Sequence, residues 1–525
     1  MSHPQNRSWQ IRKPAVTGPH GIVAAQSRLA AEAGAAILRQ GGNAVDAAIA
    51  TAFALGAAEP WMSGMGGGGY MVVRMAGETR AQVVDFGMRA PRGLDPADYP
   101  VVGGTAGDLF PWPRVQDDRN VFGAASVAIP GQVAGMAAAH AAFGTTDWAD
   151  LIAPAIALAD RGLTVDWFAQ MIIAGAARDL APFAASAETF LTADGFPKST
   201  PWTALAETRC DLGRLAASLR QVATEGPRSF YEGPLAQSIV ADLRAAGGCH
   251  SAEDFAAYEA RITDADHMTY RGHTIINTPH LTAGPTMRRA FELLADWQPR
   301  GDAPDAEALI AYDSALRRAN GERYATMGDT GDEPDPSCTS HFNVVDAAGN
   351  MVAVTQTLLS IFGSRLMLPT SGLLMNNGIM WFDPEPGRPN SLGPGKRCLS
   401  NMCPTLLERA DGARVALGAS GGRKIFPAVA QLTSMLLDYD MDLDTALHAP
   451  RIDVSLAETT IADTSLAPEV LEALHERLAQ VTPAPRTTYP LYFACPSAVG
   501  RTGPQNSGAT EVMSPWADAV AATPA

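Results

Sequence analysis

The sequence changes character at one place, near residue 338. Residues 329–337 (DTGDEPDPS) are acidic and contain two prolines and a glycine, which is typical of an exposed, flexible connection. The residues before this connection carry mainly helical patterns, whereas those after it alternate like strands, first at 341–346 and 350–358. We therefore expect a larger helix-rich part, residues 1–338, and a smaller strand-rich part, residues 339–525.

The residues at this junction suggest how a cut would create a reactive group. Cleavage of the Cys338–Thr339 bond gives Thr339 a free α-amine beside its hydroxyl group. The pKa of an α-amine is near 8, so a useful fraction is unprotonated at neutral pH and can accept the hydroxyl proton. The local sequence also fits a simpler interpretation, in which Thr339 and Ser340 only cap the start of a strand.

Composition narrows the functional classes. The chain has 525 residues, of which 46% are hydrophobic and 18% charged, which is typical of a globular enzyme. A formal net charge of −16 disfavours binding to nucleic acid. Because the sequence shows neither an apolar leader nor a membrane-length apolar stretch, we expect no membrane partner and a cytoplasmic location. The six cysteines are scattered without a CxxC pair, so we expect no disulfide framework and no zinc site. Self-cleavage at Thr339 needs no metal or organic cofactor, so we expect none.

Short motifs along most of the chain resemble, in the same order, those of the γ-glutamyltransferase (glutathione hydrolase) family of N-terminal-nucleophile hydrolases. They include GIVAAQ (21–26), GGNAVDAA (41–48), EPWMSGMGGGGYMVV (59–73), DFGMRAP (85–91), YRGHTI (270–275), TSHFNVVD (339–346), GKRCLSNMCPT (395–405) and GASGGRKI (418–425). The resemblance implies an α+β fold, a four-layer αββα sandwich in which both parts of the chain form one body.

The resemblance also assigns the catalytic positions. It makes Thr339 the self-processing residue and the nucleophile, and Thr357 the threonine that hydrogen-bonds the nucleophile. Thr357 lies two residues after Thr355 and therefore on the same strand face. Gly421 and Gly422 are implied as the oxyanion hole, where backbone N–H groups approach developing negative charge. Taken alone, these residues also fit an ordinary strand and a tight turn.

The resemblance places Ser400 and Asn401 at the carboxylate of the substrate, with Asn401 in place of a second hydroxyl residue. A simple polar loop is an equal interpretation of this pair. The Gly-rich residues 63–69 are not a phosphate-binding loop, because no Gly-Lys-Ser/Thr ending follows and the next segment alternates like a strand. In the family this segment is a packing turn near the active site.

Three departures from the family fall on the acyl-binding pocket. Gly87 stands where the family has the arginine that holds the α-carboxylate of a glutamyl group, Trp381 where it has the aspartate that holds the α-ammonium, and Leu359 where it has an asparagine. A buried zwitterion needs partners for both charges, so these changes favour a smaller or less charged acyl group. Alternatively, Arg89 and Asp383, each two residues further on, perform the two usual roles. The residues between Trp381 and Ser400 are also too few for a long lid, which favours hydrolysis over transfer.

Three functional hypotheses follow. The first is an autoprocessing amidohydrolase that cleaves a γ-glutamyl-type amide through an acyl-enzyme. The second keeps this mechanism with a less charged acyl group, as in family relatives that act on oxamate or cephalosporin side chains. The third is a binding homologue that is never processed, against which the joint presence of Thr339, Thr357, Gly421 and Gly422 argues. The expected partners are a small amide substrate and the two fragments of the chain, and the sequence leaves a homo-oligomer open.

Overall fold

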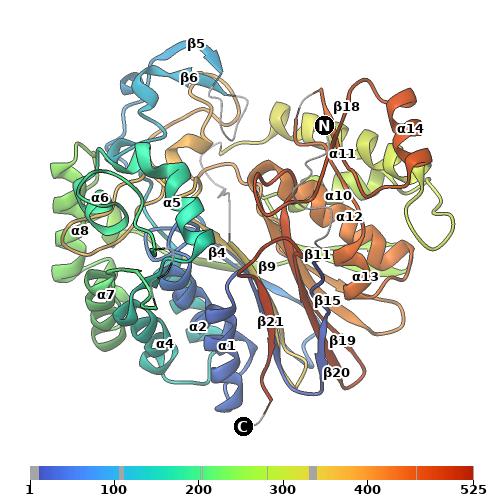
Figure 1. The fold of residues 1–525 in the computed structure, drawn as a ribbon, viewed down its shortest axis with the longest axis horizontal. Helices are drawn as coiled ribbons and strands as arrows, with labels where there is room; N and C mark the ends of the chain where they lie inside the picture. Colours follow the sequence, from blue (N-terminus) through green and yellow to red (C-terminus); the bar gives the residue numbers. More distant parts are fainter. Residues whose placement is uncertain are drawn as a thin grey trace.

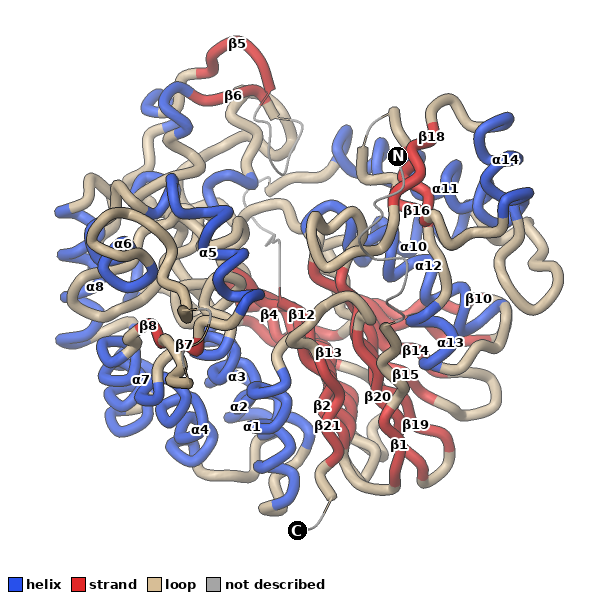
Figure 2. Tube along the Cα trace, viewed as in Figure 1, coloured by secondary structure: helices blue, strands red, loops and turns tan. Residues whose placement is uncertain are grey.

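Two seven-stranded sheets lie face to face in the computed structural model, with helices covering both outer faces (Figures 1 and 2). The structure describes residues 11–105, 112–201, 203, 205–280, 282–329, 340–456 and 458–523. Thr339 therefore lies outside the described residues. The four layers are those of the expected αββα sandwich, and they confirm a mixed α+β fold.

Both sheets are antiparallel throughout. The order of strands in the first sheet is β21 (Asp518–Ala521), β2 (Ile22–Ala25), β12 (Ser340–Val345), β13 (Met351–Thr357), β3 (Gly68–Arg74), β4 (Gln82–Phe86) and β9 (Arg261–Asp264). The order in the second sheet is β1 (Val16–Gly18), β20 (Gln505–Thr510), β19 (Cys495–Thr502), β15 (Arg414–Ser420), β14 (Thr405–Glu408), β11 (His273–Asn277) and β10 (Asp266–Tyr270).

Strands from the two parts of the chain are interleaved. Strand β2, from the larger part, lies between β12 and β21, both from the smaller part. In the second sheet, β1 pairs with β20 in the same way. The expected division into a helix-rich and a strand-rich part is therefore a division of the sequence only, because each sheet contains strands from both parts.

The helices form the two outer layers. Those on the side of the first sheet are α1 (Arg28–Arg39), α2 (Ala44–Ala58), α3 (Gln132–Phe143), α4 (Trp148–Arg161), α5 (Trp167–Leu180), α6 (Ala184–Phe190), α7 (Gly213–Glu225), α8 (Gly233–Ala245) and α9 (Ala252–Ala256). Those on the side of the second sheet are α10 (Gly284–Leu293), α11 (Ala306–Thr326), α12 (Ile425–Asp438), α13 (Leu443–His448) and α14 (Pro468–Arg477). Within the described residues, no helix combines the length and the apolar character that a membrane span requires.

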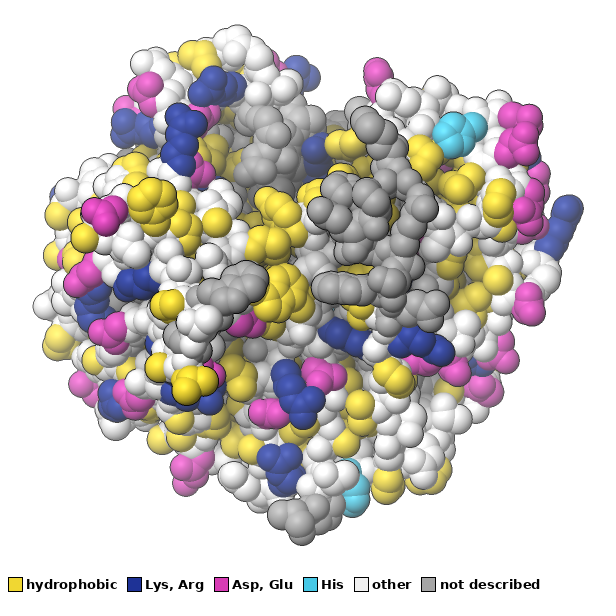
Figure 3. Space-filling model, in the orientation of Figure 1, with side chains coloured by type: hydrophobic (Ala, Val, Ile, Leu, Met, Phe, Trp, Pro, Cys, Tyr) yellow, Lys and Arg dark blue, Asp and Glu magenta, His cyan; other side chains and the backbone are white. Residues whose placement is uncertain are grey.

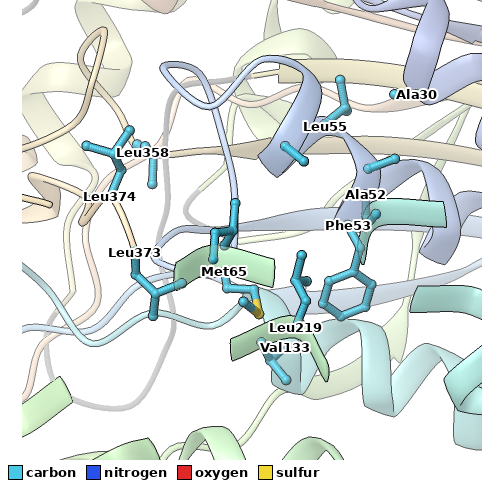
Figure 4. Packing of buried hydrophobic residues seen from close by; sticks show 14 of the residues in the cluster. Ala30, Ala52, Phe53, Leu55, Met65, Val133, Leu219, Leu358, Leu373 and Leu374 are labelled. Carbon is cyan, nitrogen blue, oxygen red and sulfur yellow. The ribbon is translucent and has the colours of Figure 1, made fainter. Parts of the chain in front are cut away.

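Three hydrophobic cores separate the layers. In β2, Ile22 and Ala24 face the second sheet, whereas Val23 and Ala25 face the helices, as the two-residue period of a strand requires. Small residues dominate the helical core around α2, where Ala52 and Phe53 lie near Val133 and Leu219 (Figure 4). Helix α2 begins with the expected cap: the Asn43 side chain accepts hydrogen bonds from the backbone N–H groups of Val45 (2.8 Å) and Asp46 (3.0 Å).

The sequence patterns indicate three features that the structure corrects: one strand over residues 269–277, another over 372–376, and a loosely ordered end over the last 25 residues. Residues 269–277, expected as one strand, form a hairpin of β10 and β11, because Arg271 and Gly272 both adopt positive φ and reverse the chain. Residues 372–376, expected as a strand, make only an isolated bridge between Leu374 and Met367. The last 25 residues, expected to be loosely ordered, contribute β20 and β21.

Smaller elements complete the fold. A short sheet contains β16 (Ile452–Asp453), β17 (Thr460–Asp463) and β18 (Val481–Ala484), and two strand pairs are formed by β5 (Val101–Thr105) with β6 (Pro113–Val115) and by β7 (Leu163–Thr164) with β8 (Arg209–Cys210). The sequence patterns did not predict α6, α13 or β9, which are short.

Candidate active site

Strand ends from both sheets meet at one edge of the sandwich. In the first sheet, the register pairs Ser340 with Gln356, Thr357 with Gly68, and Phe342 with Ala25. The start of β12 therefore lies beside the end of β13, the start of β3 and the end of β2. Thr339 directly precedes β12 in the sequence and lies outside the described residues.

The second sheet brings the Gly421–Gly422 pair to the same edge. These glycines follow β15, whose last residue, Ser420, accepts a hydrogen bond from the side-chain amide of Gln26. Gln26 directly follows β2, so this contact joins the ends of β2 and β15 across the two sheets. The structure thus brings Thr357, Gly421 and Gly422 to the edge at which β12 begins.

The turn after β15 has the properties that an oxyanion hole needs. Gly421 and Gly422 have φ values of 129° and 61°, which favour glycine at both positions. Among the described residues, neither of their N–H groups donates a backbone hydrogen bond. Helix α12 begins three residues later, so its positive end points toward the same place. The arrangement suits the stabilisation of a negatively charged oxygen.

Thr357 is held by two hydrogen bonds at the end of β13. Its hydroxyl accepts from the backbone N–H of Leu359 (2.6 Å) and donates to the carbonyl oxygen of Met62 (3.4 Å). The expectation that Thr357 shares a strand face with Thr355 is confirmed, because both lie on the face of β13 that is turned toward the second sheet. Residues 62–63 therefore belong to the site: the Ser63 hydroxyl also accepts from that of Ser340 (3.1 Å).

A buried polar group lies directly below this edge, between the sheets. The Nδ1 atom of His341 is 2.8 Å from the hydroxyl of Thr355, and Nε2 is 3.1 Å from the side-chain oxygen of Asn343. Burial lowers the pKa of His341 to about 3, and the hydrogen bond with Asn343 acts in the opposite direction. His341 is therefore neutral at ordinary pH, and it fixes the first residues of β12.

Ser400 and Asn401 precede β14 at the same edge, since continuing the β14–β15 register places residues 400–402 beside the end of β15. The Ser400 hydroxyl accepts from the N–H of Met402 (2.9 Å), and its carbonyl oxygen accepts from Arg323. The Nδ2 atom of Asn401 is buried and has no hydrogen-bond partner among the residues that the structure describes. An unsatisfied buried donor of this kind is costly, so it marks a place where a ligand acceptor would fit.

The structure places Gly87 at the edge but directs Arg89 elsewhere. Gly87 follows β4, and its carbonyl oxygen accepts from the hydroxyl of Tyr258 (2.6 Å). The Nε atom of Arg89 donates to the carbonyl oxygen of Gly395 (2.6 Å). Burial lowers the pKa of Arg89, and the charges of Arg397 and other arginines add to this effect. The guanidinium group of Arg89 therefore lies within a basic cluster and is held by the chain at Gly395.

Sequence reasoning missed Arg397, which is buried beside Gly87. It forms an ion pair with Asp85 (3.3 Å), donates to the Gly87 carbonyl oxygen (3.3 Å) and stacks on the Tyr258 ring. Gln26, Ser63 and Glu59 were also missed. Gln26 and Glu59 directly follow β2 and α2, where a polar residue after an apolar run was the available signal, whereas Ser63 lies in the turn between α2 and β3.

The other predicted pocket residues lie in the segment after β13. Leu359 has a φ of 86°, which is strained for leucine, and is almost fully buried. Trp381 is fully buried, and its carbonyl oxygen accepts from Trp112 (3.2 Å). Its indole Nε1 has no partner in the described part of the chain. Asp383 accepts from the N–H of Glu385 (2.9 Å), and burial raises its pKa. Asp383 is therefore used within its own turn.

Comparisons with known proteins agree with this geometry. The profile of the gamma-glutamyltranspeptidase family matches residues 30–335 and 303–515. The acylase ACY 1 proenzyme of Pseudomonas sp. (strain SE83) is 34% identical over 487 residues, which cover 86% of this chain and 85% of the acylase. The chain belongs to the gamma-glutamyltranspeptidase family. It is therefore an enzyme, an amide hydrolase of the N-terminal-nucleophile type.

One further sequence relative and one solved structure are also similar to this chain. The glutathione hydrolase proenzyme of Bacillus subtilis (strain 168) is 27% identical over 524 residues, covering 89% of this chain and 86% of that protein. The crystal structure of cephalosporin acylase from Bacillus halodurans matches with a TM-score of 0.86 at 22% identity and covers 99% of both chains, which supports the fold. Because the sequence relatives are proenzymes, this gamma-glutamyltranspeptidase family member is expected as processed chain fragments.

Proposed function

We propose that this enzyme hydrolyses an amide whose acyl group is less charged than a free γ-glutamyl group, through an acyl-enzyme formed on Thr339. In this mechanism the chain cleaves itself before Thr339. The freed α-amine then takes the proton of the Thr339 hydroxyl, whose oxygen attacks the amide carbon. The N–H groups of Gly421 and Gly422 stabilise the tetrahedral intermediate, the amine leaves, and water releases the acid.

One observation carries the substrate assignment. At the described positions where this chain departs from the family, no charged side chain is free to pair with a charged acyl group. Gly87 stands in place of the family's arginine. Of the nearby guanidinium groups among the described residues, that of Arg89 is hydrogen-bonded to Gly395 and that of Arg397 is paired with Asp85. Trp381 replaces the aspartate, and Asp383 is engaged in its own turn. A zwitterionic head group would therefore be buried without counter-charges, which costs several kcal/mol.

Two other observations favour the same substrate class. The unpaired Nδ2 donor of Asn401 suits a carbonyl or other neutral acceptor, because a single amide gives less stabilisation than an arginine fork. The acylase from strain SE83 is also more similar to this chain, at 34% identity, than the Bacillus subtilis glutathione hydrolase, at 27%. Few residues separate Trp381 from Ser400, so no long lid excludes water, and we expect hydrolysis rather than transfer.

The experiment is a panel of amides whose products are identified by mass spectrometry. The panel contains γ-glutamyl amides such as glutathione, together with amides of uncharged acyl groups and of dicarboxylic half-acids. We expect the purified enzyme to release the uncharged or singly charged acids faster than glutamate. Release of glutamate from glutathione as the fastest reaction would overturn the proposal.

A gain-of-function variant tests the pocket directly. Gly87→Arg combined with Trp381→Asp should raise kcat/KM for γ-glutamyl amides, because both counter-charges are restored. Leu359→Asn, which changes less buried volume, is a second variant in case Trp381→Asp fails to fold. Gly103→Arg is the matched control, since Gly103 has open space around it. If the folded variants show no increase in kcat/KM for γ-glutamyl amides, the pocket assignment is wrong.

A further inference from the structure

A cavity of about 310 Å³ opens on the surface of the first helical layer, and none of the predicted catalytic residues lines it. It lies among the first turn of α1, the end of α2, the end of α4 and the chain just before β21. This volume falls at the lower end of the range for small-molecule pockets. Its apolar lining includes Leu29, Ala57, Ala58, Leu158, Leu163 and Trp516.

Three of the four charged side chains that line the cavity are engaged in ion pairs or hydrogen bonds. Arg28 forms ion pairs with Asp518 (2.7 Å) and Glu32 (2.8 Å). The Asp166 carboxylate accepts from the Trp516 indole (2.7 Å) and from two backbone N–H groups. Arg161, at the end of α4, forms no ion pair with any residue in the described part of the chain. Its guanidinium group also makes no side-chain hydrogen bond to the described residues, so it is available to bind an anion.

The first turn of α1 adds to this positive potential. Its N-cap residue, Ser27, lines the cavity and makes no side-chain capping bond, and the turn contains no acidic residue. The partial positive charge of the helix end is therefore not neutralised by the helix itself. Figure 3 shows that apolar side chains gather near the centre of this face of the molecule, above a group of oppositely charged ones.

We propose that this cavity binds a small apolar carboxylate, with the carboxylate at Arg161 and the start of α1 and the hydrocarbon part against Trp516 and the leucines. The site is separate from the one at which the amide is cleaved, because none of the predicted catalytic or substrate-binding residues lines it. The acid is either a product of the enzyme's own amide hydrolysis or an acid from another source. The recognised chemistry is the same in both cases.

The Trp516 ring connects the cavity with the catalytic edge. It packs on Trp61 with a ring-centroid separation of 5.2 Å. The next residue, Met62, accepts hydrogen bonds from Leu358 (2.9 Å) and from Thr357 (3.4 Å). A ligand against Trp516 therefore contacts a chain of packed groups that ends at Thr357, and it changes the surroundings of an indole, which fluorescence detects.

The test uses phenylacetate as the probe, with 2-phenylethanol and phenethylamine as its neutral and cationic counterparts. Binding is measured on the full chain by calorimetry and by tryptophan fluorescence. We expect one phenylacetate per chain, binding at least tenfold more tightly than either counterpart. Arg161→Gln should weaken phenylacetate binding about tenfold, as loss of a charge-assisted contact predicts, and the half-exposed Leu29→Glu should abolish it.

Two controls separate this proposal from the proposed function. Arg178→Gln removes another exposed arginine from the same helical layer, outside the cavity, and should leave binding unchanged. The inactive Thr339→Ala chain should bind phenylacetate as the wild type does, so a failure of the proposed catalysis leaves this result intact. Each of three outcomes would overturn the proposal. They are no binding of phenylacetate at millimolar concentration, equally tight binding of 2-phenylethanol, and phenylacetate binding that is unaffected by Arg161→Gln and Leu29→Glu. Comparing acids released from the amide panel with unrelated acids distinguishes the two sources.

Discussion

The imidazole ring of His341 in β12 lies against the backbone of Gly418 in β15, in the place that a side chain at residue 418 would occupy. This contact joins the two sheets directly below the catalytic edge. It also explains why a glycine stands within a buried strand, where the residue type otherwise weakens pairing. The hydrogen bonds of His341 to Thr355 and Asn343 then fix the ring between the sheets.

Gly418→Ala should destabilise the enzyme, because the added methyl group overlaps the His341 ring within a tightly packed interface. We expect a loss of about 1–3 kcal/mol in the free energy of unfolding, measured by urea titration. The control is Gly321→Ala in α11, where a new Cβ meets open space and helix propensity rises, so stability should hold or increase. An unchanged urea midpoint for Gly418→Ala would show that the interface between the sheets adjusts to the methyl group without loss of stability.

The stability of the protein should fall as the pH drops below 6.5, through His341. Its pKa in the folded state is about 3, below the ordinary value of 6.5, so the folded protein disfavours the proton that the unfolded chain binds. This contribution is complete above pH 6.5 and is lost progressively toward pH 3, by up to about 1.4 kcal/mol per pH unit. Urea titrations between pH 7 and pH 4 should show a smaller slope for His341→Gln than for the wild type. An equal slope would assign the effect to other groups.

Glu59 should give the opposite pH dependence of stability: its contribution should decrease as the pH rises above 4.5. Burial raises the pKa of Glu59 to about 8, and a hydrogen bond from Trp61 opposes this shift. Its Oε2 atom is buried and has no hydrogen-bond partner within the described residues. Because the folded protein keeps a proton that the unfolded chain releases, this contribution to stability is lost as the pH rises from 4.5 through 8. Glu59→Gln should remove this loss and be more stable than the wild type at pH 8, by thermal unfolding. A variant that is less stable at pH 8 would mean that the carboxylate is ionised and paired.

Gly421→Ala should reduce kcat strongly and change KM less. A methyl group here would come 3.0 Å from the Cα atom of Ala494, and the φ of 129° is unfavourable for alanine, so the N–H groups of the turn should move. Loss of one oxyanion donor costs about 100- to 1,000-fold in rate. Gly412→Ala is the matched control, since its φ is also positive, at 86°, but no atom lies near. Similar kcat losses in both variants would indicate general strain rather than an oxyanion hole.

The sequence predicted the layers of the fold, whereas the catalytic roles of Thr357, Gly421 and Gly422 stay predictions. Long periodic segments such as α2 carry their own signal, and the Asn43 cap places its start. The hairpin at 266–277 and strands β20 and β21 lacked such a signal, because short strands rich in small residues obtain their stability from neighbours distant in sequence. The same limit applies to the site: the ion pair between Arg397 and Asp85 joins residues 312 positions apart, which no local pattern reveals.

Thr339→Ala should give an intact chain without activity, whereas the wild type should give two fragments that stay together. A single uncut band and no activity are expected on gels of the variant, because alanine has no hydroxyl group to attack the preceding peptide bond. Thr326→Ala is the control, since that hydroxyl bonds only within its own helix. The wild-type fragments should separate only in denaturant, because β2 of the larger fragment lies between β12 and β21 of the smaller one. Sequencing the smaller fragment should read Thr-Ser-His-Phe from its first residue; any other start, or a processed Thr339→Ala chain, would show that a different residue attacks.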